Sequence, residues 1–184
     1  MGKGVRLFGK AVSLIMMFLL VMGTLALVFN VQPVKSDYAW TQTIYIQSDG
    51  SIQPPTAPIF SIDNVTYTLT DNITGAGARA ISIQRNNTII DGAGHTLQGI
   101  NASNSEGIDV TGSNVAIKNM KIIAFTYGIF LDYSSGNTLS GNNVTANNGV
   151  GVVLETYSDN NTLSGNNIAN NYDGIAFDSN SGNT

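Results

Sequence analysis

The sequence contains no cysteine and few charged residues, which make up 11% of the chain. The absence of cysteine excludes disulfide bonds and thiolate metal sites. Coiled coils and helical bundles are disfavoured too, because both depend on many Glu, Lys, Ala and Leu residues. Beyond residue 36, only Arg79, Arg85, Lys118 and Lys121 oppose all 12 acidic residues, a balance of −8. Nucleic-acid binding is therefore not expected, since it needs clustered Lys and Arg side chains to neutralise phosphate.

The N-terminal segment predicts export. Lys3, Arg6 and Lys10 precede an uncharged, apolar stretch over residues 11–29. A basic start followed by an apolar run is typical of a secretory signal peptide, which we assign to residues 1–36. The alternative is an uncleaved membrane anchor, because the stretch would rise about 28 Å as a helix, close to the ~30 Å hydrocarbon core of a bilayer. In both cases we expect the rest of the chain to be extracytoplasmic, either secreted or at the cell surface.

Internal repeats determine the predicted fold. The phrase Asn137–Val144 returns as Asn161–Ile168, 24 residues later. A second phrase, Gly128–Asp132, returns as Gly151–Glu155 and Gly174–Asp178, each time after 23 residues. Within each copy the apolar residues alternate, as they do in β-strands, and Asn and Gly residues typical of turns separate the copies.

Short strands and tight turns at this period predict an all-β fold, a right-handed parallel β-helix in which each repeat forms one turn, or rung, of a solenoid. Equivalent residues of successive rungs would then stack about 4.8 Å apart. Four inward columns are predicted: Ile108, Ile129, Val152 and Ile175; Val110, Leu131, Leu154 and Phe177; Ile90, Ile117, Leu139 and Leu163; and Ile122, Val144 and Ile168. Met120, Asn142 and Asn166 align between the last two columns, and the two asparagines would form either an amide ladder or independently solvated turns. A leucine-rich repeat is the rival architecture, but it requires more leucine and a helical segment.

The chain divides into three predicted parts. Residues 1–36 form the signal peptide or anchor, the non-repeating residues 37–75 an N-terminal cap, and residues 76–184 the repeats. An end cap is expected because an open β-helix end would expose unpaired backbone and apolar core. The final residues, Asn183 and Thr184, would begin another repeat phrase, so we expect the complete array to continue beyond them.

The motif Ile89–Leu97, followed by the Asn-Thr-Leu-Ser-Gly-Asn-Asn phrases, resembles the NosD-type β-helix domain, also called the carbohydrate-binding and sugar-hydrolase (CASH) repeat. The lead-in over residues 44–59 resembles the region before that domain in archaeal surface proteins. The resemblance implies a pectin-lyase-like solenoid. It does not specify a function, because similar coils carry lyases, hydrolases, epimerases, accessory proteins and adhesive scaffolds.

An acidic column is the first candidate site. Asp132, Glu155 and Asp178 occupy the same place in three successive repeats, which predicts carboxylates roughly 5 Å apart. A calcium ion would relieve their mutual repulsion, because Ca²⁺ prefers oxygen ligands. The alternative is a solvated acidic stripe without a cofactor.

Catalysis is not expected. Asp91 and Asp109 are the weak candidates for a pair of catalytic carboxylates on adjacent rungs, with Arg85 and Lys118 as the basic groups nearby. The consecutive acids and the His-Gly motif of sugar-active relatives are missing. His95 is assigned to a turn.

Copper binding is not expected either. Cuprous ions prefer Cys, Met or several His ligands, whereas the predicted exported part contains one His, His95, and one Met, Met120. The resemblance to NosD therefore implies, at most, an indirect role in copper chemistry.

Tyr133, Tyr157 and Tyr172 are candidate carbohydrate contacts, because they lie, as Tyr127 also does, at or beside predicted turns, where exposed rings would stack on sugar faces. Packing across the turns is the alternative. Six glycosylation sequons fit an exported glycoprotein: Asn64, Asn72, Asn86, Asn101, Asn143 and Asn160.

These patterns predict an exported, non-catalytic scaffold or carbohydrate-contacting module whose partner is a surface polysaccharide or glycan, with the membrane as a further partner if the anchor is retained. Two alternatives stay open. The chain would be part of a polysaccharide lyase, hydrolase or epimerase, or a NosD-like accessory protein in copper-enzyme maturation.

Overall fold

The computed structural model describes residues 39–179 and 181–184. This part of the chain belongs to one compact unit, and all of its regular elements are β-strands. Within the same ranges, no helix with the length and apolar character of a membrane span is found. The predicted signal peptide or anchor lies outside the described residues.

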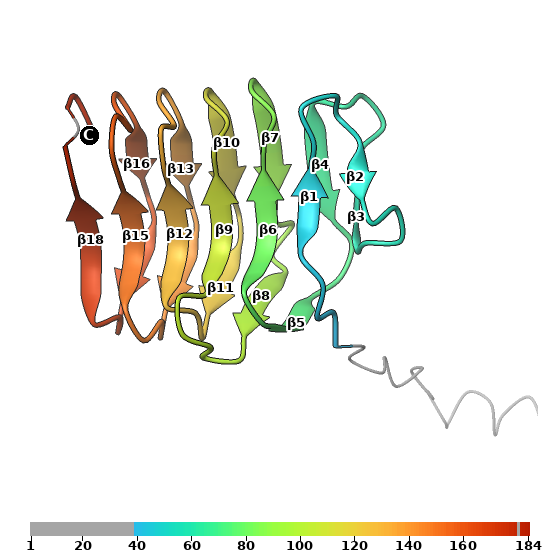
Figure 1. Cartoon of the computed structure of the whole chain (residues 1–184), viewed down its shortest axis with the longest axis horizontal. Helices are drawn as coiled ribbons and strands as arrows, with labels where there is room; N and C mark the ends of the chain where they lie inside the picture. Colours follow the sequence, from blue (N-terminus) through green and yellow to red (C-terminus); the bar gives the residue numbers. More distant parts are fainter. Residues whose placement is uncertain (1–38, 180) are drawn as a thin grey trace, which may run out of the picture. The chain divides into compact units, whose positions relative to one another are not determined.

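The strands form three sheets (Figure 1). Sheet A contains β1 (Ile44–Ile46), β2 (Ile52–Gln53), β6 (Arg79–Ile83), β9 (Glu106–Val110), β12 (Tyr127–Leu131), β15 (Val150–Leu154) and β18 (Asp173–Phe177). Sheet B contains β3 (Ile59–Phe60), β4 (Thr66–Leu69), β7 (Thr88–Asp91), β10 (Val115–Lys118), β13 (Thr138–Ser140) and β16 (Thr162–Ser164). Sheet C contains β5 (Ile73–Ala76), β8 (Thr96–Gly99), β11 (Lys121–Ile123), β14 (Asn143–Thr145) and β17 (Asn167–Ala169).

The chain visits the sheets in the order B, C, A, and it completes this circuit about five times. From β4 onward, each strand pairs in parallel with the equivalent strand of the next rung, as β12 does with β9 and β15. Figure 1 shows the strands of sheet A side by side along the solenoid. The predicted parallel β-helix is thus confirmed. A leucine-rich repeat is excluded for the described residues, which contain no helix.

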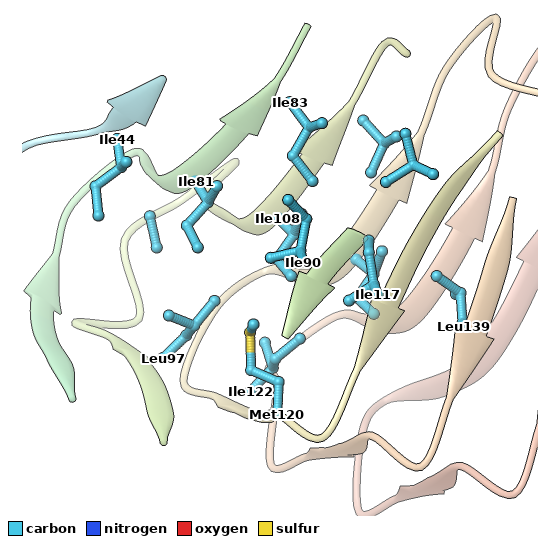
Figure 2. Packing of buried hydrophobic residues seen from close by; sticks show 14 of the residues in the cluster. Ile44, Ile81, Ile83, Ile90, Leu97, Ile108, Ile117, Met120, Ile122 and Leu139 are labelled. Carbon is cyan, nitrogen blue, oxygen red and sulfur yellow. The ribbon is translucent and has the colours of Figure 1, made fainter. Parts of the chain in front are cut away.

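The four predicted columns are confirmed by the strand register. In sheet A, Ile108 aligns with Ile129, and the column extends one rung further towards the N-terminus, to Ile81. The column that begins at Val110 also lies in sheet A, the column that begins at Ile90 lies in sheet B, and the column that begins at Ile122 lies in sheet C. Figure 2 shows side chains from all three sheets, among them Ile90 and Leu97, gathered in the interior, where they form one apolar core.

The N-terminal strands join the solenoid through both parallel and antiparallel pairing. Strands β1, β4 and β5 pair in parallel with the next rung, whereas β2 and β3 pair antiparallel with β1 and β4. The boundary expected at residue 75 falls within β5. Of the segment predicted as a cap, the two antiparallel strands are therefore the part that departs from the solenoid pattern.

Asparagine ladders join successive rungs at all three corners between the sheets. The ladders are Asn137, Asn161 and Asn183 between sheets A and B, Asn142 and Asn166 between sheets B and C, and Asn147 and Asn171 between sheets C and A. In the predicted ladder, Asn142 Oδ1 accepts from the backbone N–H of Met120 at 3.2 Å, and Asn142 Nδ2 donates to the carbonyl of Ile117 at 2.8 Å. Asn166 Oδ1 accepts from both the backbone N–H and Nδ2 of Asn142. The amide ladder is confirmed, and the alternative of independently solvated turns is wrong.

Candidate functional site

Most of the polar and aromatic side chains that the sequence marks as candidates lie on the strands of sheet A or close to the ends of these strands. Because side chains alternate along a strand, Asp109 points away from the core that its neighbours Ile108 and Val110 enter. Phe130 and Val153 align with Asp109 on the next two rungs. The outward face of sheet A therefore changes along the solenoid from polar side chains on β6 and β9 to apolar ones on β12 and β15.

A charged cluster occupies the polar part of this face. The Arg79 guanidinium donates to the Glu106 carboxylate through Nε, and its Nη1 lies 3.2 Å from Asp109 Oδ2. Ser82 Oγ donates to the same Asp109 oxygen at 3.0 Å. Glu106 and Asp109 are buried, with 8% and 4% of their surface exposed.

Burial raises the pKa of Glu106, and the negative charges of Asp109 and Glu155 add to this, although Arg79 opposes it. The hydrogen bond to Glu106 raises the pKa of Arg79 in turn, with burial opposing and Asp109 adding to the rise. The guanidinium therefore stays charged and holds both carboxylates. Arg79 thus occupies both carboxylates, and Ser82 occupies Asp109 as well.

The predicted catalytic candidates are not brought together. Asp109 lies in sheet A, whereas Asp91 ends β7 in sheet B. Asp91 pairs with Lys118 at 3.2 Å and accepts from Asn119 Nδ2 and from the backbone N–H of Ala93. Burial opposes ionisation of Asp91, but these partners together hold its pKa below the ordinary value. The two carboxylates thus have separate partners on separate sheets.

The acidic column follows the strands of sheet A. Asp132, Glu155 and Asp178 each lie one residue beyond β12, β15 and β18, and their backbone N–H groups donate to the preceding rung at 3.2, 2.8 and 2.9 Å. Their predicted equivalence in three rungs is therefore present. Among residues 39–179 and 181–184, however, no three His, Cys, Asp or Glu side chains converge as a group able to hold a metal ion.

Two of the three candidate tyrosines come together at the corner that follows sheet A. The rings of Tyr133 and Tyr157 lie 5.8 Å apart between centroids at 46°, and each residue is 64% exposed. We call this pair the tyrosine corner. Tyr172 is 85% exposed but directly precedes β18, at the opposite end of the strands. The structure therefore separates it from the other two.

Sequence reasoning missed the charged cluster and the aromatic pair of Tyr127 and Phe130, whose ring centroids lie 5.5 Å apart on the outward face of β12. Arg79 aligns with Glu106 only after an interval of 27 residues, because a loop over residues 100–105 lengthens that rung. A search allowing for unequal rungs would have placed Arg79 beside Glu106.

The parallel β-helix places the chain in the class of solenoid repeat proteins. Charged and aromatic side chains lie along sheet A, so the exposed faces of its rungs are the candidate binding surface. A family model described as periplasmic copper-binding protein (NosD) matches residues 30–184, and the chain belongs to this family. The periplasmic description supports the extracytoplasmic location expected from the N-terminal segment. No curated protein and no solved structure matches the chain.

The donor atoms of residues 39–179 and 181–184 do not fit the copper in the family's description. The chain has no cysteine and one histidine, His95. Met120, the one methionine of the described residues, is 1% exposed and packs in the interior beside Leu97 and Ile122 (Figure 2). Copper in proteins is held by several imidazole or sulfur ligands, which the described residues do not bring together.

Proposed function

We propose that the chain is an exported, non-catalytic β-helix module that contacts carbohydrate through the tyrosine corner. One observation carries this proposal: Tyr133 and Tyr157 are exposed, lie against each other and adopt left-handed backbone conformations, with φ of 50° and 56°.

The backbone conformation makes tyrosine a costly choice at these positions. Eight of the fourteen non-glycine residues with positive φ in the described part of the chain are asparagine, the residue that tolerates this conformation best after glycine. A bulky side chain there costs on the order of 1 kcal/mol or more. Strain of this kind is often found at ligand-binding sites. Both rings are exposed, so packing in the core does not compensate for the strain.

The geometry of the tyrosine corner suits a sugar chain. The two rings belong to successive rungs, so their 5.8 Å separation is comparable to the length of one pyranose unit. Aromatic rings bind the apolar face of a sugar, while neighbouring polar groups bind its hydroxyls. An extended oligosaccharide lying along the solenoid axis would therefore place consecutive units on consecutive tyrosines.

The charged groups of the chain support a binding role rather than hydrolysis. Glycoside hydrolysis requires two carboxyl groups facing each other across the scissile bond. Asp109 and Glu106 are instead buried and held by Arg79, and Asp91 is paired with Lys118 on another sheet.

The test is binding of the full chain to an oligosaccharide array, followed by titration of any ligand found. The double variant Tyr133→Asn/Tyr157→Asn removes both rings but installs the residue that suits the backbone, so it is expected to fold. With about 1 kcal/mol lost per ring, its affinity should fall about 30-fold. Tyr172→Asn removes a more exposed ring that directly precedes β18, at the other end of the sheet A strands, and should bind as the parent does.

Two results would overturn the proposal. One is an array on which the parent chain binds no carbohydrate. The other is an unchanged affinity in the double variant, provided that circular dichroism and the melting temperature show a folded β-helix.

A second candidate, supported by the family match, is an accessory role in the maturation of a copper enzyme. The missing copper donors favour contact with a partner protein over copper transfer by this chain. Deletion of its gene would then lower the metal content of the partner enzyme, and His95→Ala would leave that content unchanged.

A further inference from the structure

The part of the chain that carries the tyrosine corner, residues 122–184, contains no positively charged residue. Every Lys and Arg of the described residues lies at or before Lys121, and no basic residue or histidine follows it. Five acidic residues lie in the remaining part of the chain: Asp132, Glu155, Asp159, Asp173 and Asp178. Within residues 122–184, a ligand bound at the tyrosine corner therefore meets carboxylates and no cationic side chain.

The acidic column runs directly beside the tyrosine corner. Asp132 precedes Tyr133 by one residue, and Glu155 precedes Tyr157 by two, so the Cα atoms of each acidic residue and its tyrosine lie within about 7 Å of each other. Among residues 39–179 and 181–184, neither carboxylate has an ion pair or a hydrogen-bond partner. Both residues are partly exposed. A sugar unit stacked on either tyrosine would therefore have a carboxylate within reach of its edge.

We propose that the tyrosine corner and the acidic column together select carbohydrate that carries ammonium groups, namely oligomers of deacetylated amino sugars. This inference rests on the proposed carbohydrate contact and specifies its ligand class. The rings bind the sugar face, and Asp132 and Glu155 attract the protonated amines. Uronate and sulfated sugars are repelled by the same carboxylates.

The magnitude follows from Coulomb attraction between exposed charges. An ammonium about 5 Å from one carboxylate in water gains about fourfold in affinity, so two such contacts give roughly 15-fold at low salt. Screening reduces this factor as the ionic strength rises. The preference should therefore be large at 20 mM salt and small at 500 mM.

The experiment compares four probes by titration calorimetry at pH 6, where primary amines carry charge. The probes are the tetramers of glucosamine, N-acetylglucosamine and galacturonate, together with tetralysine. We expect the glucosamine tetramer to bind at least tenfold more tightly than the N-acetylated tetramer, and the galacturonate tetramer most weakly. The variant Asp132→Asn/Glu155→Gln should abolish this order but keep the binding of the neutral sugar. Asp173→Asn, at the opposite end of β18, is the matched control and should change nothing.

The outcomes separate this inference from the proposed function. If the N-acetylated and deacetylated tetramers bind equally and the double variant has no effect, the selectivity is wrong and the carbohydrate contact stands. If no sugar binds, both proposals fail. If tetralysine binds as tightly as the glucosamine tetramer, with or without the two tyrosines, the corner is a site for cationic peptides and the selectivity for amino sugars is wrong.

Discussion

The asparagine ladders make a quantitative prediction for the variant Asn142→Ala. Asn142 is 2% exposed, and its side chain accepts the backbone N–H of Met120 and donates to the carbonyl of Ile117. Alanine leaves the Met120 N–H buried without an acceptor, at a cost of about 2 kcal/mol, and removes one net hydrogen bond worth about 1 kcal/mol. Asn166 Oδ1 keeps the backbone N–H of residue 142 as a donor, so it adds no further penalty. The free energy of unfolding should fall by about 3 kcal/mol.

Urea denaturation measures this effect. With a slope near 2 kcal/mol per molar urea, the midpoint of Asn142→Ala should fall by about 1.5 M. The control is Asn167→Ala, one residue from the ladder position Asn166. Asn167 is exposed, and its Nδ2 donates only to Asn143 Oδ1, so its loss should cost about 0.5 kcal/mol or less. If the midpoints of the two variants differ by less than about 0.3 M, the ladders do not stabilise the fold as argued.

Three further changes test packing, electrostatics and metal chemistry. A Cβ at Gly128 would clash with Val144 Cγ1, so Gly128→Ala should lower the free energy of unfolding by about 2–3 kcal/mol. Gly174→Ala is the control and should be neutral, because a Cβ there would meet no atom within 4 Å. Equal melting temperatures of the two variants would contradict this. Because the pKa of Glu106 is raised on folding, its contribution favours the folded state below its ordinary pKa of 4.5 and is lost as the pH rises through the higher folded pKa. The parent should therefore lose stability relative to Glu106→Gln as the pH rises above 4.5, and the difference should level off above the folded pKa. Parallel pH profiles of the two urea midpoints would show that burial of the carboxylate has no such effect. Titration of the full chain with Cu(I) should reveal no tightly bound copper ion. A tightly bound ion that is lost in His95→Ala would refute the argument that the chain lacks suitable copper ligands.

The solenoid was predictable because β12, β15 and β18 repeat at a constant interval, so residues such as Leu131 and Leu154 align without gaps. The same regularity placed the acidic column and the Asn142 ladder correctly. The other two ladders had the same signal, since Asn137 and Asn147 also recur 24 residues later, but asparagine in a turn has several local uses that sequence alone does not separate.

The N-terminal rungs were aligned only in part from the sequence, which paired Ile90 with Ile117, because insertions change the interval elsewhere. Ile44 pairs with Ile81 across 37 residues that include the antiparallel strands β2 and β3. The ion pair of Arg79 and Glu106 depends on the same kind of irregularity, here the loop over residues 100–105. The separation of Tyr172 from Tyr133 was readable from the sequence, because Tyr172 precedes its copy of the repeat phrase whereas Tyr133 follows its copy.

In the C-terminal rungs, hydrogen bonds run from one asparagine to the next at all three corners, so successive rungs present nearly the same surface to the rung that follows. A tandem duplication of the gene segment for residues 137–160 would therefore insert a unit that fits both of its new neighbours. Evolution can lengthen such an array in steps of one unit without redesigning the rest, and each added copy of this segment would bring one more Tyr157 equivalent. The number of ring contacts offered to a long polymer would then be set by copy number, and avidity would rise without any change in the individual contact.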